Sequence, residues 1–383
     1  MGKVQKGLEN VNALETKISF IDGREGILEY RGYNINQLAN LSYAAVSYLL
    51  IYGELPNESE LTAFTKELRE NREIDKEIIE VVHACNFNVE AMDVLRTAVS
   101  YLSHCDPDLS ENTLEANLRK AMRIIAKVPT IIATFYRIRN GLERILPDSS
   151  LSHGANFLYM LRGSKPTETE AKIMEADFVI SAEHELNAST FSARVSISTL
   201  SDLHSGISAG MGTLKGPLHG GARFEVMKML DEIKTPEKAE EYVLNLITNK
   251  KRVMGFGHRV YKTYDPRGVI FKKLAREIAE EKGDLCWYEI AENIERTVIR
   301  ELVEKRGKPI YPNVDFYIGV IYNYLGIPPK LATSVFSIGR VVGWIAHCIE
   351  QYADNRLIRP RAQYTGDRGA KIIPSIVPMT PDT

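Results

Sequence analysis

Residues 328–349, PPKLATSVFSIGRVVGWIAHCI, carry the clearest structural signal in this sequence. Apolar residues recur there at steps of three and four, which is the period of an α-helix that buries one face. The two prolines stand at the start, where a first helical turn tolerates them. The pattern predicts a long buried helix, whose apolar face is formed by Leu331, Val335, Ile338, Val342, Ile345 and Ile349.

Two segments upstream show the same helical period. One runs from Trp287 to Leu302 and the other from Ile270 to Ala279, and each has apolar residues on one face. Alternation typical of strands is convincing only at Lys17–Tyr30, where Asp22-Gly23 predicts a turn between two short runs. We therefore predict a fold that is nearly all-α.

The composition narrows the class of protein. The 383 residues include 48 basic and 50 acidic side chains, so the formal charge is −2, and 44% of the residues are hydrophobic. This balance argues against nucleic-acid or membrane-surface partners. The most apolar segments, 316–327 and 335–349, are too short or carry polar residues, whereas a membrane span needs about 18 to 20 apolar residues in a row. We expect no membrane-spanning segment.

The spacing of the cysteines and the residues at the N-terminus indicate the cellular compartment. The four cysteines are far apart and form no CxxC pair, which fits reduced thiols better than disulfides or a zinc site. No secretory signal is visible after Met1. We expect a cytoplasmic protein.

Three breaks rich in glycine or proline each adjoin an ionisable residue. The first, residues 215–222, contains His219 just before a helical pattern that begins near Phe224. The positive end of a helix dipole disfavours imidazolium, so we expect a neutral histidine that can donate a hydrogen bond. A histidine that merely fills a turn is the alternative.

The second break, residues 253–267, contains two glycines, then His258 and several cations. Val260 occupies the third glycine position of a dinucleotide-binding loop, so that interpretation fails. The glycines would let the backbone approach a ligand closely. Arg267 offers bidentate recognition of a carboxylate or phosphate, and Lys262 offers a point charge. A solvated basic loop is the alternative.

The third break leads to Asp315 at the start of an apolar helix. Asp315 could be a helix-start residue, or a general base whose pKa is raised by partial desolvation beside Phe316 and Tyr317. Arg340 lies within the predicted buried helix, where a cation needs a partner. Further arginines follow in a cluster, and structural and anion-binding roles are both open for Arg356, Arg359 and Arg361.

Taken together, these segments resemble citrate synthase. The resemblance rests on the ordered set 216–220 (GPLHG), 255–258 (GFGH), 265–267 (DPR) and 312–315 (PNVD), and it extends from Asp22 to Arg361. It implies an all-α homodimer. It also implies a large helical domain, residues 1–218 and 321–383, and a smaller mobile helical domain, residues 219–320, with the active site in the cleft between them.

The resemblance further implies condensation of acetyl-CoA with oxaloacetate and water to give citrate and CoA, without a metal or redox cofactor. Asp315 is similar to the base that removes a methyl proton. His219 is similar to the donor to the thioester oxygen, and His258 to the histidine that polarises the ketone of oxaloacetate. This division of roles is chemically reasonable, because a thioester methyl is too weak an acid for a carboxylate alone.

The remaining family roles concern binding. The residues similar to those that bind the carboxylates of oxaloacetate are His184, Arg267 and Arg340, together with Arg359, which the partner subunit would supply. The residues similar to those that bind CoA are Val253, Met254, Gly255, Phe256, Gly257, Lys262 and Lys308.

Two alternatives stay open from the sequence. A 2-methylcitrate synthase would share the fold and catalytic set but accept propionyl-CoA, and one methylene is worth only about 1 to 3 kcal/mol of discrimination. A non-catalytic CoA-binding relative is the other. The presence of Asp315, His219 and His258 argues against it.

Overall fold

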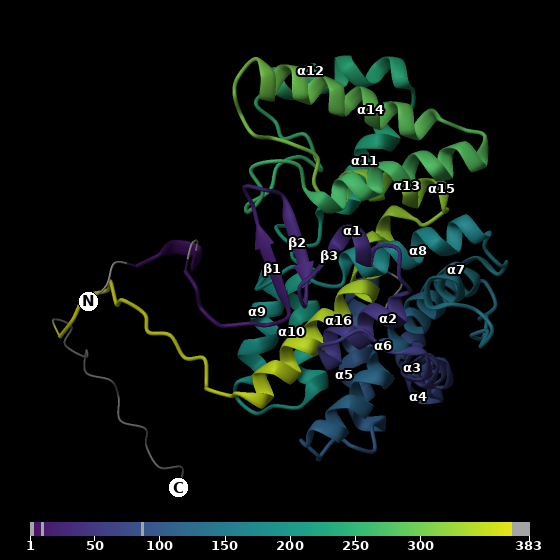
Figure 1. Ribbon diagram of the computed structural model, residues 1–383, viewed down its shortest axis with the longest axis vertical. Helices are drawn as coiled ribbons and strands as arrows, with labels where there is room; N and C mark the ends of the chain where they lie inside the picture. The colour runs from purple at the N-terminus through teal and green to yellow at the C-terminus, as the bar shows by residue number, and fades with distance from the viewer. Residues whose placement is uncertain (1–3, 9–10, 86–87, 370–383) are drawn as a thin grey trace, which may run out of the picture.

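The computed structural model describes residues 4–8, 11–85 and 88–369, and it is mostly helical (Figure 1). The prediction of a nearly all-α fold is confirmed at that level. The helices are α1 (Ile35–Leu38), α2 (Tyr43–Tyr52), α3 (Glu58–Glu70), α4 (Lys76–Ala84), α5 (Ala91–Cys105), α6 (Leu114–Arg139), α7 (His153–Arg162), α8 (Glu168–Ser181), α9 (Ala188–Ile197), α10 (Leu203–Leu214), α11 (Ala222–Ile233), α12 (Ala239–Thr248), α13 (Pro266–Lys282), α14 (Cys286–Val298), α15 (Val314–Tyr324) and α16 (Ala332–Ala353).

The strands form one small antiparallel sheet in the order β1 (Ser19–Asp22), β2 (Ile27–Tyr30) and β3 (Tyr33–Asn34). The predicted turn is present: Asp22 Oδ1 accepts the backbone N–H groups of Arg24 and Glu25 at 2.8 and 3.0 Å. The hairpin turn contacts the second break, because Lys262 N donates to Gly23 O at 2.8 Å. Strand β3 was not predicted, since two residues are too few to show alternation.

The predicted helix at 328–349 is the centre of the core. A short 3₁₀ turn, Pro329–Leu331, leads into α16, which packs against α6, α8, α9 and α10. Gly343 allows a close approach, because a Cβ at this position would collide with the carbonyl oxygen of Ala182 at the end of α8. That approach brings Arg340 against Ser181.

The prediction that no segment could span a membrane was wrong on length. Residues Pro329–Ala353 form one continuous helical segment that is long and apolar enough by composition, because the helix extends beyond the apolar run read from the sequence. However, 83% of its most apolar window is buried inside the protein. It is a core helix.

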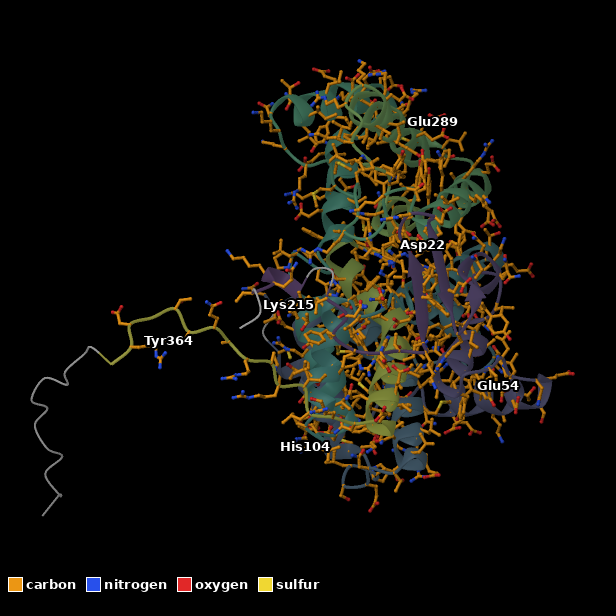
Figure 2. The ribbon with its side chains drawn as sticks, turned by 60° about the vertical axis from the view of Figure 1, so that its left-hand side comes forward. Asp22, Glu54, His104, Lys215, Glu289 and Tyr364 are labelled. Atoms are coloured by element: carbon orange, nitrogen blue, oxygen red, sulfur yellow. The ribbon has the colours of Figure 1, made fainter. Side chains whose placement is uncertain are left out.

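Helices α11 to α15 gather at one end of the molecule, at the top of Figure 1. There α13 and α11 pack against α15, and α12 packs against α14. The helix predicted from Trp287 is α14, which continues as a π-helical turn at Ile299–Glu304. Figure 2 shows the same division, with Glu289 of α14 at one end and Glu54 and His104 toward the other. We call this end the upper lobe and the rest the body.

Candidate active site

His219 lies on the connection between α10 and α11, two residues before Gly221, the N-cap of α11. The predicted position just before a helix start is therefore confirmed. Its Nε2 lies 2.8 Å from Ser189 Oγ, which also accepts the indole N–H of Trp344 at 3.1 Å. Burial, and after it the charge of Arg340, lowers the pKa of His219 to about 4. The ring is neutral at pH 7, as the sequence predicted.

The hydroxyl of Ser189 decides which nitrogen of His219 carries the proton. Its hydrogen has two acceptors in reach, Asn187 Oδ1 at 2.7 Å and His219 Nε2 at 2.8 Å. Asn187 Oδ1 already accepts the backbone N–H of Thr190 as a helix cap. When Ser189 donates to Asn187 Oδ1, its oxygen accepts a proton from His219 Nε2–H, and when it donates to Nε2, the proton of the neutral ring is on Nδ1. Nδ1 makes no hydrogen bond within the described residues, so it is available to a ligand.

His258 is held by its own loop. The backbone N–H groups of Val260 and Tyr261 both point at His258 Nδ1, at 3.0 and 3.2 Å. Nδ1 is therefore the acceptor, and Nε2 carries the proton of a neutral ring. Burial, followed by the charge of Arg267, lowers the pKa of His258 to about 4. His258 is a neutral donor through Nε2.

Asp315 stands in the first turn of α15, where Asn313 caps the helix by accepting the backbone N–H of Asp315 at 3.0 Å. Asn313, rather than Asp315, is thus the cap. Asp315 Oδ1 accepts Arg223 Nε at 3.0 Å, and its side chain is 18% exposed. Oδ2 makes no hydrogen bond in the described part of the chain. The carboxylate therefore has one oxygen held and one available.

The predicted oxaloacetate-binding residues of this chain also meet. The rings of His184 and His258 lie 5.2 Å apart in an edge-to-face arrangement, and His184 Nε2 is 3.3 Å from Tyr261 OH. Arg267 Nη2 lies 3.5 Å from His258 Nε2. Burial, then the charges of Arg267, His258 and Arg340, lowers the pKa of His184 well below its usual value. These residues form an electropositive cluster whose imidazoles are neutral.

Arg340 is a buried cation without an ion-paired carboxylate among the described residues. Its Nε donates to Ser181 O at 2.7 Å, and its guanidinium lies 4.7 Å from the ring centroid of Phe336. Burial lowers the pKa of Arg340 to about 10, although the charge of Glu183 opposes this. Removing a cation from water is costly unless an anion faces it. The geometry therefore suits a dianionic ligand.

Besides Ser189, two residues that build the site were given no role from the sequence. Asp265 pairs with Arg267 through two hydrogen bonds of 3.0 and 2.8 Å and accepts the backbone N–H of Val314 at 3.2 Å. Arg223 binds Asp315. The Asp265-Pro266-Arg267 motif was a usable signal for the first of these. No local pattern marks Arg223 as a partner of a residue 92 positions away.

The predicted CoA loop is joined to the third break. Gly257 N donates to Tyr311 O at 2.8 Å, and Asn313 N donates to Gly255 O at 2.9 Å. Both glycines have positive φ, +77° and +82°, which L side chains rarely adopt. Phe256 packs on Phe316 with ring centroids 4.6 Å apart. The loop and the start of α15 thus form one unit.

The other predicted CoA residues lie on or beside that unit. Val253 is buried beneath the loop and Met254 is partly buried. The two candidate lysines, Lys262 and Lys308, are exposed, and Lys262 Nζ reaches the carbonyl oxygen of Arg259 at 3.1 Å. Their charges face solvent.

Arg359 does not join the site of its own chain. It is exposed on the extended segment that follows α16, which runs away from the helices toward the same side as the described N-terminal residues (Figure 1). This segment is attached to the body through Ile358 N, which donates to Ser198 Oγ at 3.1 Å.

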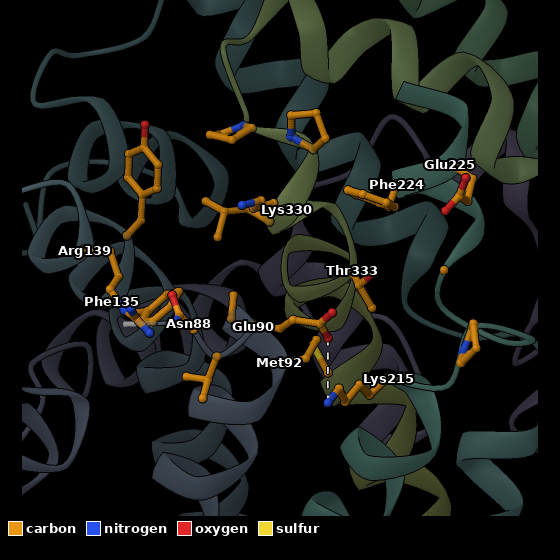
Figure 3. Close-up of a pocket in the computed structure, with 18 of the residues that line it drawn as sticks. Asn88, Glu90, Met92, Phe135, Arg139, Lys215, Phe224, Glu225, Lys330 and Thr333 are labelled. Atoms are coloured by element: carbon orange, nitrogen blue, oxygen red, sulfur yellow. Dashed lines mark ion pairs between the residues drawn. The ribbon is translucent and has the colours of Figure 1, made fainter. Parts of the chain in front are cut away.

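A cavity of about 920 Å³ lies beside the site rather than in it. Figure 3 shows its walls, which come from the starts of α5 and α11, the end of α6 and the start of α16. Pro217, Gly221 and Thr333 border it behind the His219 connection, and Lys215 pairs with Glu90 across it at 3.7 Å. No predicted site residue lines it. The convergence of side chains, not this cavity, therefore locates the candidate site.

The side chains form a continuous series from one end of the site to the other. His258 meets Arg267, Asp265 joins Arg267 to the start of α15, and there Arg223 binds Asp315. The site thus combines a carboxylate with one available oxygen, neutral imidazoles and a buried arginine without a carboxylate partner. On a mostly helical fold, this combination is typical of an enzyme that moves protons on an anionic substrate.

The chain belongs to the citrate synthase family, because the family model described as citrate synthase, C-terminal domain, matches residues 7–361. A citrate synthase of Haloferax volcanii is 45% identical over 379 residues, which cover 97% of this chain and 98% of that protein. The predicted function, citrate synthase, and the predicted enzyme class, an acyltransferase that converts acyl to alkyl, are confirmed.

Solved structures agree with this assignment. Citrate synthase from Pyrobaculum aerophilum has a TM-score of 0.90 at 40% identity, with 96% of this chain and 94% of that chain covered. A ternary complex of the Thermoplasma acidophilum citrate synthase with carboxymethyl coenzyme A and oxaloacetate has a TM-score of 0.91 at 36% identity, with 98% and 99% covered. A 2-methylcitrate synthase of Shewanella oneidensis is 36% identical over 370 residues, with 96% of each chain covered.

Proposed function

We propose that the chain condenses acetyl-CoA with oxaloacetate and water to give citrate and CoA, using Asp315, His219 and His258. This assignment of roles rests on one observation: the site contains both a carboxylate with an available oxygen and two neutral imidazoles that can donate hydrogen bonds. A thioester methyl is a weak carbon acid. A carboxylate can remove its proton only when a donor stabilises the charge that develops on the thioester oxygen.

In the first step, Asp315 takes a proton from the acetyl methyl group through Oδ2, while His219 donates a hydrogen bond from Nδ1 to the thioester oxygen. The donor role of Nδ1 is supported by Ser189, whose hydroxyl can donate to Nε2. A neutral histidine suits this step, because it can donate the hydrogen bond without first becoming a buried imidazolium.

In the second step, the enolate carbon attacks the ketone of oxaloacetate, and the alkoxide that forms takes the proton of His258 Nε2–H. The proton that Asp315 removed from the methyl group then replaces it, so both residues return to their starting forms. The Nε2–H form is supported by the two backbone amides at Nδ1. His184, Arg267 and Arg340 hold the carboxylates of oxaloacetate. Water then cleaves the thioester of the condensed intermediate, which releases citrate and CoA.

We propose that CoA lies along residues 253–257, with Lys262 and Lys308 near its phosphates. The positive φ of Gly255 and Gly257 supports a close approach of ligand to backbone. The exposure of both lysines supports a solvent-facing phosphate group.

A homodimer would complete the site by supplying Arg359 from the partner subunit. The exposure of Arg359, on a segment that runs away from the helices (Figure 1), supports an exchange between subunits. Dimerisation would then be a condition for full activity.

We further propose that the upper lobe is a mobile small domain that closes on oxaloacetate. The predicted range 219–320 ends inside α15, so we now place its end at Tyr324, where that helix ends. Closure would exclude water and prevent idle thioester hydrolysis. Residues 370–383 of the predicted large domain lie outside the described residues.

A cytoplasmic location remains our proposal. It is supported by the four cysteines, which are all free: Cys85, Cys105, Cys286 and Cys348.

Propionyl-CoA is the second candidate acyl donor. The observation in its favour is the similarity to a 2-methylcitrate synthase over almost the whole chain. The ratio of CoA release from the two thioesters would decide the preference, and a methylene contributes about 1 to 3 kcal/mol to such a choice.

The proposed chemistry is tested by CoA release in wild type and Asp315→Asn. We expect the variant to lose about 10³-fold in kcat, since a positioned base contributes about 10² to 10⁴-fold. Glu289→Gln is the matched control, because it removes an exposed carboxylate of the same lobe (Figure 2). Equal turnover by Asp315→Asn and wild type would overturn the role of Asp315.

A further inference from the structure

Arg223 is a fully buried arginine that reaches the proposed base. It lies in the first turn of α11, four residues after His219, and is 1% exposed. Its Nε–H donates to Asp315 Oδ1 at 3.0 Å. The family roles and the mechanism above do not use it.

The rest of the guanidinium is bound from two other helices. Nη1 donates to Asp177 Oδ1 at 3.1 Å and to Tyr322 OH at 2.7 Å, and Nη2 donates to Ser181 Oγ at 2.9 Å. Tyr322 OH in turn donates to Asp177 Oδ2 at 2.6 Å. The guanidinium also lies 4.5 Å from the ring centroid of Phe336. With so many partners, the cation has one orientation available.

Charge balance supports this arrangement. Burial by itself would lower the pKa of Arg223, but Tyr322, Asp177 and Asp315 outweigh it and raise that pKa above its usual value. One cation faces two carboxylates, so the three groups carry a net charge of −1. The cation is thus shared between Asp177 and Asp315 and is not taken up by Asp315 alone.

We propose that Arg223 is a positioning residue for Asp315, an inference that rests on the proposed role of Asp315 as the base. By holding Oδ1, Arg223 selects one rotamer of the carboxylate and leaves Oδ2 to take the methyl proton. Asp177, Ser181 and Tyr322 hold Arg223 in turn.

The same support also holds the oxaloacetate side of the site. Arg340 donates to Ser181 O, whereas Arg223 donates to Ser181 Oγ. Both guanidinium groups stack on Phe336, with centroid distances of 4.5 and 4.7 Å. The base and the carboxylate-binding arginine therefore share a single rigid support at the end of α8.

The test compares Arg223→Gln and Arg223→Lys with wild type, using acetyl-CoA with a normal or a trideuterated methyl group. Arg223→Gln should lower kcat about 10²-fold, the effect of a misplaced reacting group, while KM for oxaloacetate stays unchanged. The deuterium isotope effect on kcat should be at least as large as in wild type, because proton removal has become slower. Arg223→Lys keeps the cation and should recover part of the loss.

Arg72→Gln is the matched control. It also removes a buried guanidinium, one that donates to the carbonyl oxygens of Asp148 and Leu151 in the body. We expect it to lower the unfolding temperature without changing the isotope effect. If Arg223→Gln does not fold, Arg223→Lys and Tyr322→Phe carry the same test, with smaller losses of kcat.

The outcomes separate this inference from the proposed function. An active wild type with an equally active Arg223→Gln would overturn the positioning role alone. A lower kcat with an isotope effect that falls toward 1 would also overturn it, because another step would then be limiting. A wild type that releases no CoA from acetyl-CoA would instead remove the proposed function.

Discussion

The connection that carries His219 and the loop that carries His258 each present one neutral imidazole, but they hold it differently. His219 depends on side chains of the body, Ser189 on α9 and, through it, Trp344 on α16. His258 depends on the backbone amides of Val260 and Tyr261, in its own loop. In both, burial lowers the pKa to about 4.

This difference shows which part of the molecule determines the tautomer of each histidine. The tautomer of His258 is determined locally, so it would be kept if the upper lobe moves. The tautomer of His219 is determined by a hydroxyl that belongs to the body. His219 is the first residue of the proposed small domain and has its partner in the body, whereas the partners of His258 would move together with it.

Substitutions that mimic one ring nitrogen give the largest expected difference between the two loops. An asparagine amide lies near Nδ1 of a histidine, and a glutamine amide near Nε2. His219→Asn and His258→Gln should therefore retain more activity than His219→Gln and His258→Asn. Losing a donor entirely costs about 10² to 10³-fold in kcat, and we expect the matched amide to recover about 10-fold.

The measurement is kcat for CoA release by the four variants, with the unfolding temperature of each as a check on folding. If His219→Gln were the more active variant of its pair, Nε2 rather than Nδ1 would be the donor. The proposed tautomer would then be wrong for His219, while that of His258 would be unaffected.

Removing the hydroxyl of Ser189 should affect only one loop. Ser189→Ala leaves His219 Nε2 and the Trp344 indole N–H without their partner, and an unsatisfied buried donor costs about 1 to 3 kcal/mol. We expect a lower unfolding temperature. We also expect kcat to fall about 10-fold, because His219 would be held less firmly as a hydrogen-bond donor.

Ser192→Ala is the control for Ser189→Ala, because Ser192 lies on the same helix and its hydroxyl donates to Ala209 O at 3.3 Å, away from the imidazoles. Normal activity of Ser189→Ala would show that the body does not orient His219.

The smallest expected effect concerns stability at low pH. An unfolded histidine binds a proton below about pH 6.5, whereas folded His219 and His258 do so only near pH 4. The unfolded state therefore binds more protons in this window, and stability falls as the pH falls from 6.5 to 4. Because both rings are partly exposed, each should contribute about 1 kcal/mol.

Urea unfolding at pH 7 and pH 5 would measure this contribution. His219→Gln and His258→Gln should each flatten the dependence on pH, while His83→Gln, at an exposed position on α4, should not. Three buried histidines outside the pair of loops act in the same direction, since burial also lowers the pKa of His153, His184 and His204. An identical pH dependence in all variants would contradict the depressed pKa values.

Much of the fold was predictable because its signals are local. The period of apolar residues predicted α13, α14 and α16, and Asp22-Gly23 predicted the hairpin turn. Strand β3 was missed, because two residues are too few for a period. The end of α16 was predicted too early, at Ile349 rather than Ala353, because the apolar run stops before the helix does.

The candidate site was predictable as a set of residues but not as a set of contacts. The motifs identified His219, His258 and Asp315, and the structure shows what holds each one. Ser189, Asp265 and Arg223 were missed as partners. Only Asp265 stands close in sequence to the group it binds.

The sequence by itself determined the helical elements, the glycine-bordered breaks and the family to which the chain belongs. These depend on residues a few positions apart and on ordered motifs. The tertiary structure alone decided which hydroxyl faces His219 Nε2 and which arginine holds Asp315. Those choices depend on pairs such as Ser189 with Trp344, separated by 155 positions, which packing around α16 brings within hydrogen-bond distance.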